Sequence, residues 1–271
     1  MPSKVTRVSI CDIPVDALTM KQTVDIIDTA IREKRPLHHG VINAAKLVNA
    51  QKNYELKKSL VDCDVINADG KAIVWASRFL KKPVPERVAG IDLMETLIAR
   101  AKQNKYRIYF FGATENVVEH VVKKYATIHG TDIIAGYCNG YYSKKDEPLI
   151  AQKIASSGAD ILFVAITSPT KEIFLNTYKN SIKIPFIMGV GGSFDVVAGV
   201  VKRAPKWMQQ YGLEWLYRVI QEPRRLWKRY LITNSMFIYL VLKEKFFPRT
   251  YNSKPSISTS EAELLLARDK K

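Results

Sequence analysis

Asp69 lies in the segment NADG (Asn67–Gly70), between an apolar strand-like run and a helix-like run. A carboxylate in such a loop can accept a proton from a substrate hydroxyl and so act as a general base. It can equally cap the helix that follows, because aspartate is a favoured N-cap residue. The local residues do not separate these two roles. A second acid, Asp92, follows Gly90 at the start of another predicted helix, where capping is the simpler interpretation.

Small residues fill three further loops, each of which follows an apolar run. They are FFGATE around Gly112, AITSPTKE around Ser168, and GVGGSFD with Gly191 and Gly192. GVGGSFD lacks the third glycine of a dinucleotide fingerprint and the lysine of a P-loop. Together the three loops predict a nucleotide-binding edge rather than an NAD site.

The sequence offers no cluster of residues with the spacing of a metal site. The three cysteines, Cys11, Cys63 and Cys138, are widely spaced, which also argues against a disulfide framework. The one Asp-X-Asp pair, Asp62 and Asp64, is interpreted as a turn that enters a strand. If phosphate groups are bound without a metal, their charge must be met by Arg, Lys and backbone N–H groups.

Strand-like and helix-like runs alternate over about the first 190 residues. Strands are predicted at Arg7–Ile10, Gly40–Asn43, Val65–Asn67, Arg107–Phe111, Asp132–Ala135, Ile161–Ala165 and Phe186–Gly189. Helices are predicted at Lys21–Glu33, Ala45–Leu60, Lys71–Leu80, Asp92–Gln103, Glu115–His129, Glu147–Ser157 and Lys171–Asn180. The alternation predicts an α/β fold whose mostly parallel sheet is covered on both faces. Ligands of such sheets bind beyond the carboxyl ends of the strands, where the loops above meet.

Composition indicates a globular chain with an anionic partner. Of 271 residues, 47% are hydrophobic and 25% charged, which excludes a disordered or collagen-like protein. The 42 Lys and Arg against 26 Asp and Glu give a net charge of +16. Nucleic acid, a phosphate-bearing ligand or a membrane surface could each balance this charge. We find no signal peptide and no apolar run of about 18 residues, so we expect a cytoplasmic protein that acts at a surface.

Residues 202–249 concentrate this charge, with eleven Lys and Arg, three acids and three of the four tryptophans. Leu213, Leu216, Tyr217 and Ile220 follow a helical period, and Pro223 is placed to start a second helix. A solvated helix face, nucleic-acid binding and membrane-surface binding are all open. Aromatic rings beside cations favour the membrane interface, where each cation contributes about 1 kcal/mol. No helix-turn-helix, zinc-finger or RNP pattern accompanies the charge, which makes nucleic acid the less favoured partner.

Several segments together resemble the WecG/TagA/CpsF glycosyltransferases over about residues 7–245. The matching segments are NADG, ERVAGIDLM, FFGATE, GYCNGYY, TSPTKE, GVGGSFDVVAG and, above all, KRAPKWMQQYGLEWLYRVIQEPRRLWKRYL. The resemblance implies a Rossmann-like core over residues 1–200, with helices on both faces of the sheet. It also implies a basic, aromatic-rich helical appendage over residues 201–249 that completes the active site and associates with the membrane. Residues 250–271 are expected to form a flexible tail.

The implied activity is an inverting, metal-independent transfer of a sugar from a UDP-sugar to a polyprenyl-diphosphate-linked sugar, in cell-surface polysaccharide biosynthesis. The expected place is the cytoplasmic face of the bacterial inner membrane, on an anionic surface. No cofactor and no nucleic acid are expected, and the family allows a homo-oligomer. VINAAK and TSPTKE depart from the teichoic-acid pattern, which favours a hexose such as glucose, as in exopolysaccharide assembly, over an N-acetylmannosamine-type donor.

The resemblance also assigns roles to residues, with Asp69 as the general base. Residues expected to bind substrate are Asn43, Asn67, Asp92, Gly112, Ser168, Glu172, Gly191, Gly192, Arg203, Arg218, Arg224 and Arg225. Residues expected to bind the membrane are Trp227, Lys228, Arg229 and Phe237. Val41 stands where many members have Thr, and Thr170 and Lys171 replace the Lys and Gln that precede Glu172. A non-catalytic nucleotide- or nucleic-acid-binding protein is the alternative, although such a protein has no need of the Asp69 carboxylate.

Overall fold

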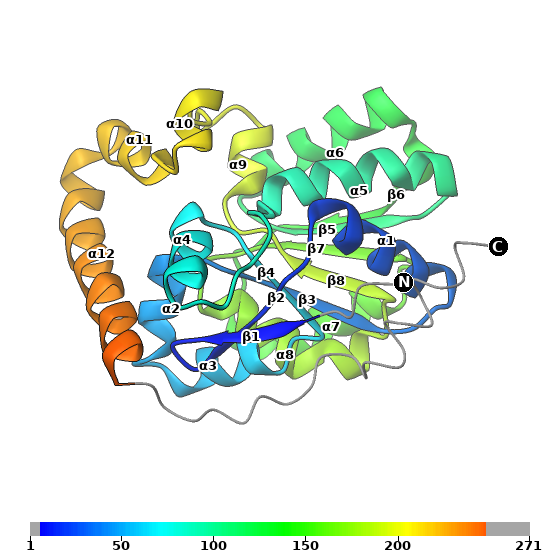
Figure 1. Ribbon diagram of the computed structural model, residues 1–271. Helices are drawn as coiled ribbons and strands as arrows, with labels where there is room; N and C mark the ends of the chain where they lie inside the picture. The colour runs from blue at the N-terminus through cyan, green and yellow to red at the C-terminus, as the bar shows by residue number, and fades with distance from the viewer. Residues whose placement is uncertain (1–5, 248–271) are drawn as a thin grey trace.

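Six strands form the central sheet of the computed structural model, which describes residues 6–247 (Figure 1). Their order across the sheet is β4-β3-β8-β7-β5-β6, and every neighbouring pair is parallel. The strands are β3 (Leu37–Ile42), β4 (Val65–Ala68), β5 (Ile108–Gly112), β6 (Ile134–Cys138), β7 (Ile161–Ala165) and β8 (Phe186–Gly189). The predicted parallel α/β fold is confirmed.

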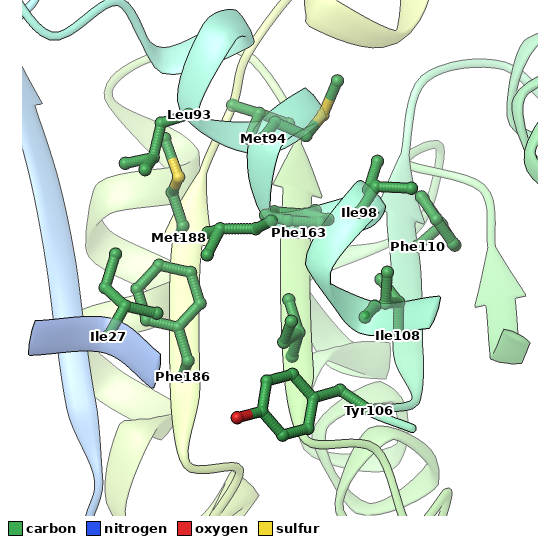
Figure 2. Packing of buried hydrophobic residues seen from close by; sticks show 14 of the residues in the cluster. Ile27, Leu93, Met94, Ile98, Tyr106, Ile108, Phe110, Phe163, Phe186 and Met188 are labelled. Atoms are coloured by element: carbon green, nitrogen blue, oxygen red, sulfur yellow. The ribbon is translucent and has the colours of Figure 1, made fainter. Parts of the chain in front are cut away.

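Helices pack on both faces of this sheet. One face is covered by α1 (Met20–Arg32), α5 (Gly90–Asn104) and α6 (Glu115–His129), and Figure 2 shows part of the apolar core beneath the first two. The other face carries α2 (Ala44–Ala50), α3 (Tyr54–Val61), α4 (Lys71–Phe79), α7 (Glu147–Ala155) and α8 (Thr170–Ile182). Burial on both faces explains why strands such as β7 are apolar throughout.

Three predicted elements differ from the structure. The single helix predicted over Ala45–Leu60 is two helices, because the Asn53 side chain accepts a hydrogen bond from Leu56 N (2.9 Å) and starts α3. A short strand, β2 (Ile13–Asp16), was not predicted, and it pairs with β1 (Arg7–Ile10) as an antiparallel hairpin outside the main sheet. The strand predicted at Asp132–Ala135 begins only at Ile134, after a 3-10 turn.

A buried ion pair attaches this hairpin to the strand that precedes Asp69. The Asp16 carboxylate accepts hydrogen bonds from Arg7 Nε and one terminal guanidinium nitrogen, both at 2.8 Å. It also accepts one from Ile66 N of β4, again at 2.8 Å. Asp16 is 1% exposed, so water cannot replace these partners. The hairpin therefore fixes the position of β4, the strand that precedes Asp69.

After the short α9 (Ser193–Val197), the chain leaves the core as an arm of α10 (Lys206–Gln210), α11 (Glu214–Gln221) and α12 (Pro223–Phe246). The arm curves around the side of the core that bears α4 (Figure 1, yellow to orange). Pro223 begins α12, as predicted. Gly212, with φ +72°, separates α10 from α11, a turn that the sequence analysis did not predict. The predicted tail, residues 250–271, lies outside the described residues.

One face of α12 belongs to the core. Phe237 and Val241 are buried in the apolar cluster that α2 and α4 also line. Nearby, the Glu244 carboxylate accepts hydrogen bonds from Cys11 N (2.5 Å) and Lys82 Nζ (2.6 Å). The prediction that Phe237 binds the membrane is therefore wrong, because its ring packs inward. Trp227, Lys228 and Arg229 are exposed and stay in the predicted membrane-binding set.

Replacing Asp16 by alanine should destabilise the protein by about 3–5 kcal/mol, because Arg7 is left as an uncompensated buried charge. The measurement is denaturant unfolding, with Asp132→Ala as the matched control. Asp132 pairs with Lys102 at 3.2 Å, but both side chains are more than half exposed, so this change should cost about 1 kcal/mol or less. Equal losses in the two variants would contradict a fixing role for the buried pair.

Candidate active site

Asp69 and Asn43 end neighbouring strands and lie side by side. The Asp69 backbone N–H donates to Ile42 O (2.8 Å), which fixes the end of β4 against that of β3. The Asn43 side chain accepts a hydrogen bond from Lys46 N (2.9 Å) and so starts α2. A Cβ atom placed on Gly70 would lie 3.6 Å from that of Asn43. The structure therefore brings these two predicted site residues together at the carboxyl edge of the sheet.

The Asp69 carboxylate does not cap the helix that follows it. Gly70 is the N-cap of α4, and no side chain caps that helix. Instead, Asp69 Oδ1 accepts a hydrogen bond from Gly90 N (3.1 Å) at the start of α5. Burial raises the pKa of this carboxyl, although Arg87, the Gly90 N–H, Lys46 and Arg218 each oppose the rise. A carboxylate with raised proton affinity is suited to general-base chemistry.

A buried ion cluster of Lys46, Glu172 and Lys171 lies behind Asp69. Glu172 Oε1 is 3.0 Å from Lys46 Nζ and 2.8 Å from Lys171 Nζ, and Lys46 Nζ also donates to Val41 O (2.6 Å). Burial alone would raise the pKa of Glu172, but the two ammonium groups lower it to about 2. Glu172 was predicted at this edge. Lys46 was not, although it stands inside the VINAAK segment.

Lys171 places a cation beside the glycine-rich loop after β8. Its Nζ atom is 3.8 Å from where a Cβ atom of Gly191 would lie, and Gly191 has φ +55°. Burial lowers the pKa of Lys171 to about 8, with Lys46 acting in the same direction and Glu172 and Asp69 opposing it. Gly192 continues this loop, and Ser168 is exposed in the loop after the adjacent β7. These predicted loops therefore share one edge of the sheet.

Gly112 has a structural role at the end of β5. A Cβ atom there would lie 2.4 Å from Ala165 O, and φ is +126°. The glycine therefore permits the close packing of β5 on β7. Asn67 is likewise structural, since it is 1% exposed and its Oδ1 atom lies 2.8 Å from His39 Nε2. The side chain of Asn67 therefore points into the core, contrary to its predicted substrate contact, whereas the substrate contact predicted for Gly112 stays a prediction.

Two ion pairs connect the arm to the active-site edge. Arg87, in the loop before α5, pairs with Glu214 at the start of α11 (2.5 Å). Arg203 pairs with Asp92 (2.7 Å), so Asp92 holds the arm and makes no cap on α5, contrary to the simpler interpretation of the sequence. Arg87 was missed as an individual residue, although the ERVAG segment that contains it was singled out.

The three other predicted arginines occupy different surroundings. Arg218 on α11 is exposed, yet it is near enough to Asp69 to lower the proton affinity of that carboxylate. Arg224 and Arg225 are exposed on the first turn of α12, and Arg225 pairs with Glu222 at 2.6 Å. No contact between these two arginines and the Asp69 edge is seen in the described chain.

The edge thus combines Asp69, an acid whose pKa is raised, with several cations on the strand ends and on the arm. Such a site can take a proton from a hydroxyl and neutralise phosphate groups. Within residues 6–247, no group of three or more His, Cys, Asp or Glu side chains is arranged to hold a metal ion. No helix in that range is long and apolar enough to cross a membrane.

Comparison with known proteins agrees with this chemistry. The model of the glycosyl transferase WecG/TagA/CpsF family matches residues 8–251. Two relatives, from Bacillus spizizenii and Bacillus subtilis, are 36% and 38% identical to the chain over 196 residues. These alignments cover 72% of this chain and 75% of each relative. Both relatives are named N-acetylglucosaminyldiphosphoundecaprenol N-acetyl-beta-D-mannosaminyltransferase. The chain belongs to the WecG/TagA/CpsF family of glycosyltransferases.

Proposed function

We propose that this protein transfers a sugar from a UDP-sugar to an N-acetylglucosamine carried on a polyprenyl diphosphate, with Asp69 as the general base. The observation that carries the proposal is the position of Asp69. It is the acid with raised proton affinity at the strand ends, and cations from both core and arm act on it. The family membership supports sugar transfer, and the names of the relatives support this lipid-linked acceptor.

The reaction is a single displacement. The acceptor hydroxyl oxygen attacks the anomeric carbon of the donor sugar while the bond from that carbon to the UDP oxygen breaks on the opposite face. The hydroxyl proton passes to the Asp69 carboxylate. Attack opposite the leaving group inverts the anomeric configuration.

The leaving diphosphate gains negative charge in the transition state, and cations already held in place can stabilise it. Lys171, beside the Gly191 loop, is suited to this task, and so is Arg218 on the arm. A guanidinium group can donate two hydrogen bonds to one phosphate group. Arginine can therefore neutralise phosphate charge as a metal ion does in other enzymes. We therefore propose that transfer proceeds without a metal.

The names of both relatives support N-acetylmannosamine as the transferred sugar. Glucose is the second candidate, because VINAAK and TSPTKE depart from the teichoic-acid pattern. The direct test is a panel of UDP-sugars offered with one lipid-linked acceptor. Transfer from UDP-N-acetylmannosamine at a far higher kcat/KM than from UDP-glucose supports the first choice. The reverse order supports the second.

The outer face of α12 supports attachment to a membrane surface. Trp227, Leu231, Ile238 and Leu242 recur at helical spacing and are 42–60% exposed, on a face of α12 that lies to one side of the buried face with Phe237. Lys228 and Arg229 flank them at one end. Rings and aliphatic side chains beside cations are typical of a helix in the interfacial plane of an anionic bilayer. The acceptor lipid would hold the reaction at that same surface.

Replacing Asp69 by asparagine should lower kcat by about 10²–10⁴-fold and leave UDP binding nearly unchanged, because the shape is kept and only the proton acceptor is lost. Steady-state kinetics and calorimetric UDP titration measure the two effects. Asp132→Asn is the control, since Asp132 is exposed in the turn that precedes β6, at the amino end of the strands and away from Asp69 and Asn43. Unchanged turnover in Asp69→Asn would show that Asp69 is not the general base.

The pH profile of kcat/KM should fall on the acidic side as Asp69 gains its proton, at a pH above the ordinary aspartate pKa of about 3.9. Arg87→Met removes a cation that lowers this pKa, so the fall should move to higher pH. Glu214→Gln removes a nearby anion and frees Arg87, so the fall should move to lower pH. Shifts in the same direction would show that the titrating group is not Asp69.

Replacing Leu231 and Ile238 together by glutamine should reduce binding to anionic vesicles by about tenfold or more, because two exposed apolar side chains leave the bilayer interface. Vesicle flotation at physiological salt measures this effect. Leu149→Gln is the control, since Leu149 is 68% exposed on α7, away from the arm. Equal binding by all three proteins would contradict attachment through α12.

A further inference from the structure

The exposed face of α4 carries an ordered series of side chains that starts at the active site. Lys71, Trp75 and Phe79 stand at positions i, i+4 and i+8, so they share one face of the helix. Trp75 is 53% exposed and Phe79 is 46% exposed, although both are large and apolar. We call these three residues the α4 stripe. The helix begins at Lys71, directly after Asp69 and Gly70.

The arm borders the α4 stripe at both ends. A Cβ atom on Gly212, between α10 and α11, would lie 2.8 Å from the Lys71 Cβ atom and 3.3 Å from Trp75 Cη2. At the other end, Lys245 of α12 donates to Phe79 O (2.7 Å), and its ammonium lies 5.1 Å from the centre of the Phe79 ring. The stripe therefore runs from the catalytic edge to the end of α12. The helix that carries it, α4, lies inside the curve of the arm (Figure 1).

From Asp69 to the end of the α4 stripe, the side-chain groups are, in order, a carboxylate, an ammonium group, an indole and a phenyl ring. The acceptor named for the relatives has the same order of complementary parts: a sugar hydroxyl, a diphosphate and a long hydrocarbon chain. With the hydroxyl at Asp69, the diphosphate falls near Lys71 and the chain has to leave the site beyond it. Trp75 and Phe79 are the large exposed apolar side chains of α4 in that direction.

We propose that the α4 stripe holds the acceptor, with Lys71 at its diphosphate and with Trp75 and Phe79 along the first part of its polyprenyl chain. The proposal rests on the proposed function. It adds a lipid-binding surface on the core that is separate from the outer face of α12. The rings cover the chain between the catalytic edge and the bilayer, where apolar contact with protein replaces contact with water.

The experiment compares two acceptors with the same N-acetylglucosaminyl diphosphate head, one on an undecaprenyl chain and one on a chain of two isoprene units. Both are assayed in detergent, so that vesicle binding does not enter. In the double variant Trp75→Gln and Phe79→Gln, KM for the long-chain acceptor should rise by roughly tenfold or more, since apolar contact is lost. KM for the short acceptor and for the donor should change less than about twofold, which is under 0.5 kcal/mol.

Two further variants test the specificity of this effect, one as a control for exposed apolar side chains and one for the diphosphate contact. Ile128→Gln removes an apolar side chain that is 59% exposed on α6, and it should alter neither KM. Lys71→Gln should raise KM for both acceptors alike, because both carry the diphosphate. Vesicle flotation of the Trp75 and Phe79 double variant should match the unmodified protein.

Three results would overturn the proposal. In the double variant, equal rises in KM for both acceptors would mean that the rings contact the head group, and no rise in either would mean that they contact no substrate. Lost vesicle binding would assign the rings to the bilayer itself. Failure of the unmodified protein to use either acceptor would instead refute the proposed function, and the stripe with it.

Discussion

The active site depends on the ion pair between Arg87 and Glu214. Arg87 belongs to the loop that follows the core helix α4, and Glu214 belongs to the arm. The same guanidinium group opposes the effect of burial on Asp69, so one side chain both holds the arm and adjusts the acid. Because a buried carboxylate needs a compensating cation to stay ionised, the arm and the base cannot be arranged independently.

This constraint explains how the positive charge is distributed. The core contributes Lys46 and Lys171, which are fixed by a shared carboxylate, Glu172, and by backbone. The arm contributes exposed arginines on α11 and on the first turn of α12, where an anionic surface or a diphosphate can reach them. Fixed cations require no rearrangement when charge develops during a reaction, which is the advantage of a prearranged site.

Much of the fold could be predicted from the sequence, because apolar runs and loop chemistry are local signals. The strand that precedes Asp69 and the helix that starts at Pro223 are examples. β1 was predicted, but β2 and its pairing with β1 were not, since this hairpin depends on the distant hydrogen bond between Asp16 and Ile66. Among the candidate site residues, Asp69 was singled out from its strand-end loop, and Asn43 from the family resemblance. Lys46 and Arg87 were missed because their roles come from partners far along the chain, and Phe237 was misplaced because α12 is apolar on two faces.

The inward face of α12 has a consequence for shortened versions of the chain. Phe237 and Val241 complete an apolar cluster that α2 also lines, and Glu244 satisfies the Cys11 amide. A fragment that ends before Pro223 would expose an apolar groove on its surface. The Cys11 N–H beside that groove would lose the Glu244 carboxylate that accepts its hydrogen bond. A second copy of the fragment can cover this groove. Dimerisation of truncated chains would therefore be a consequence of the missing helix and not a property of the intact protein.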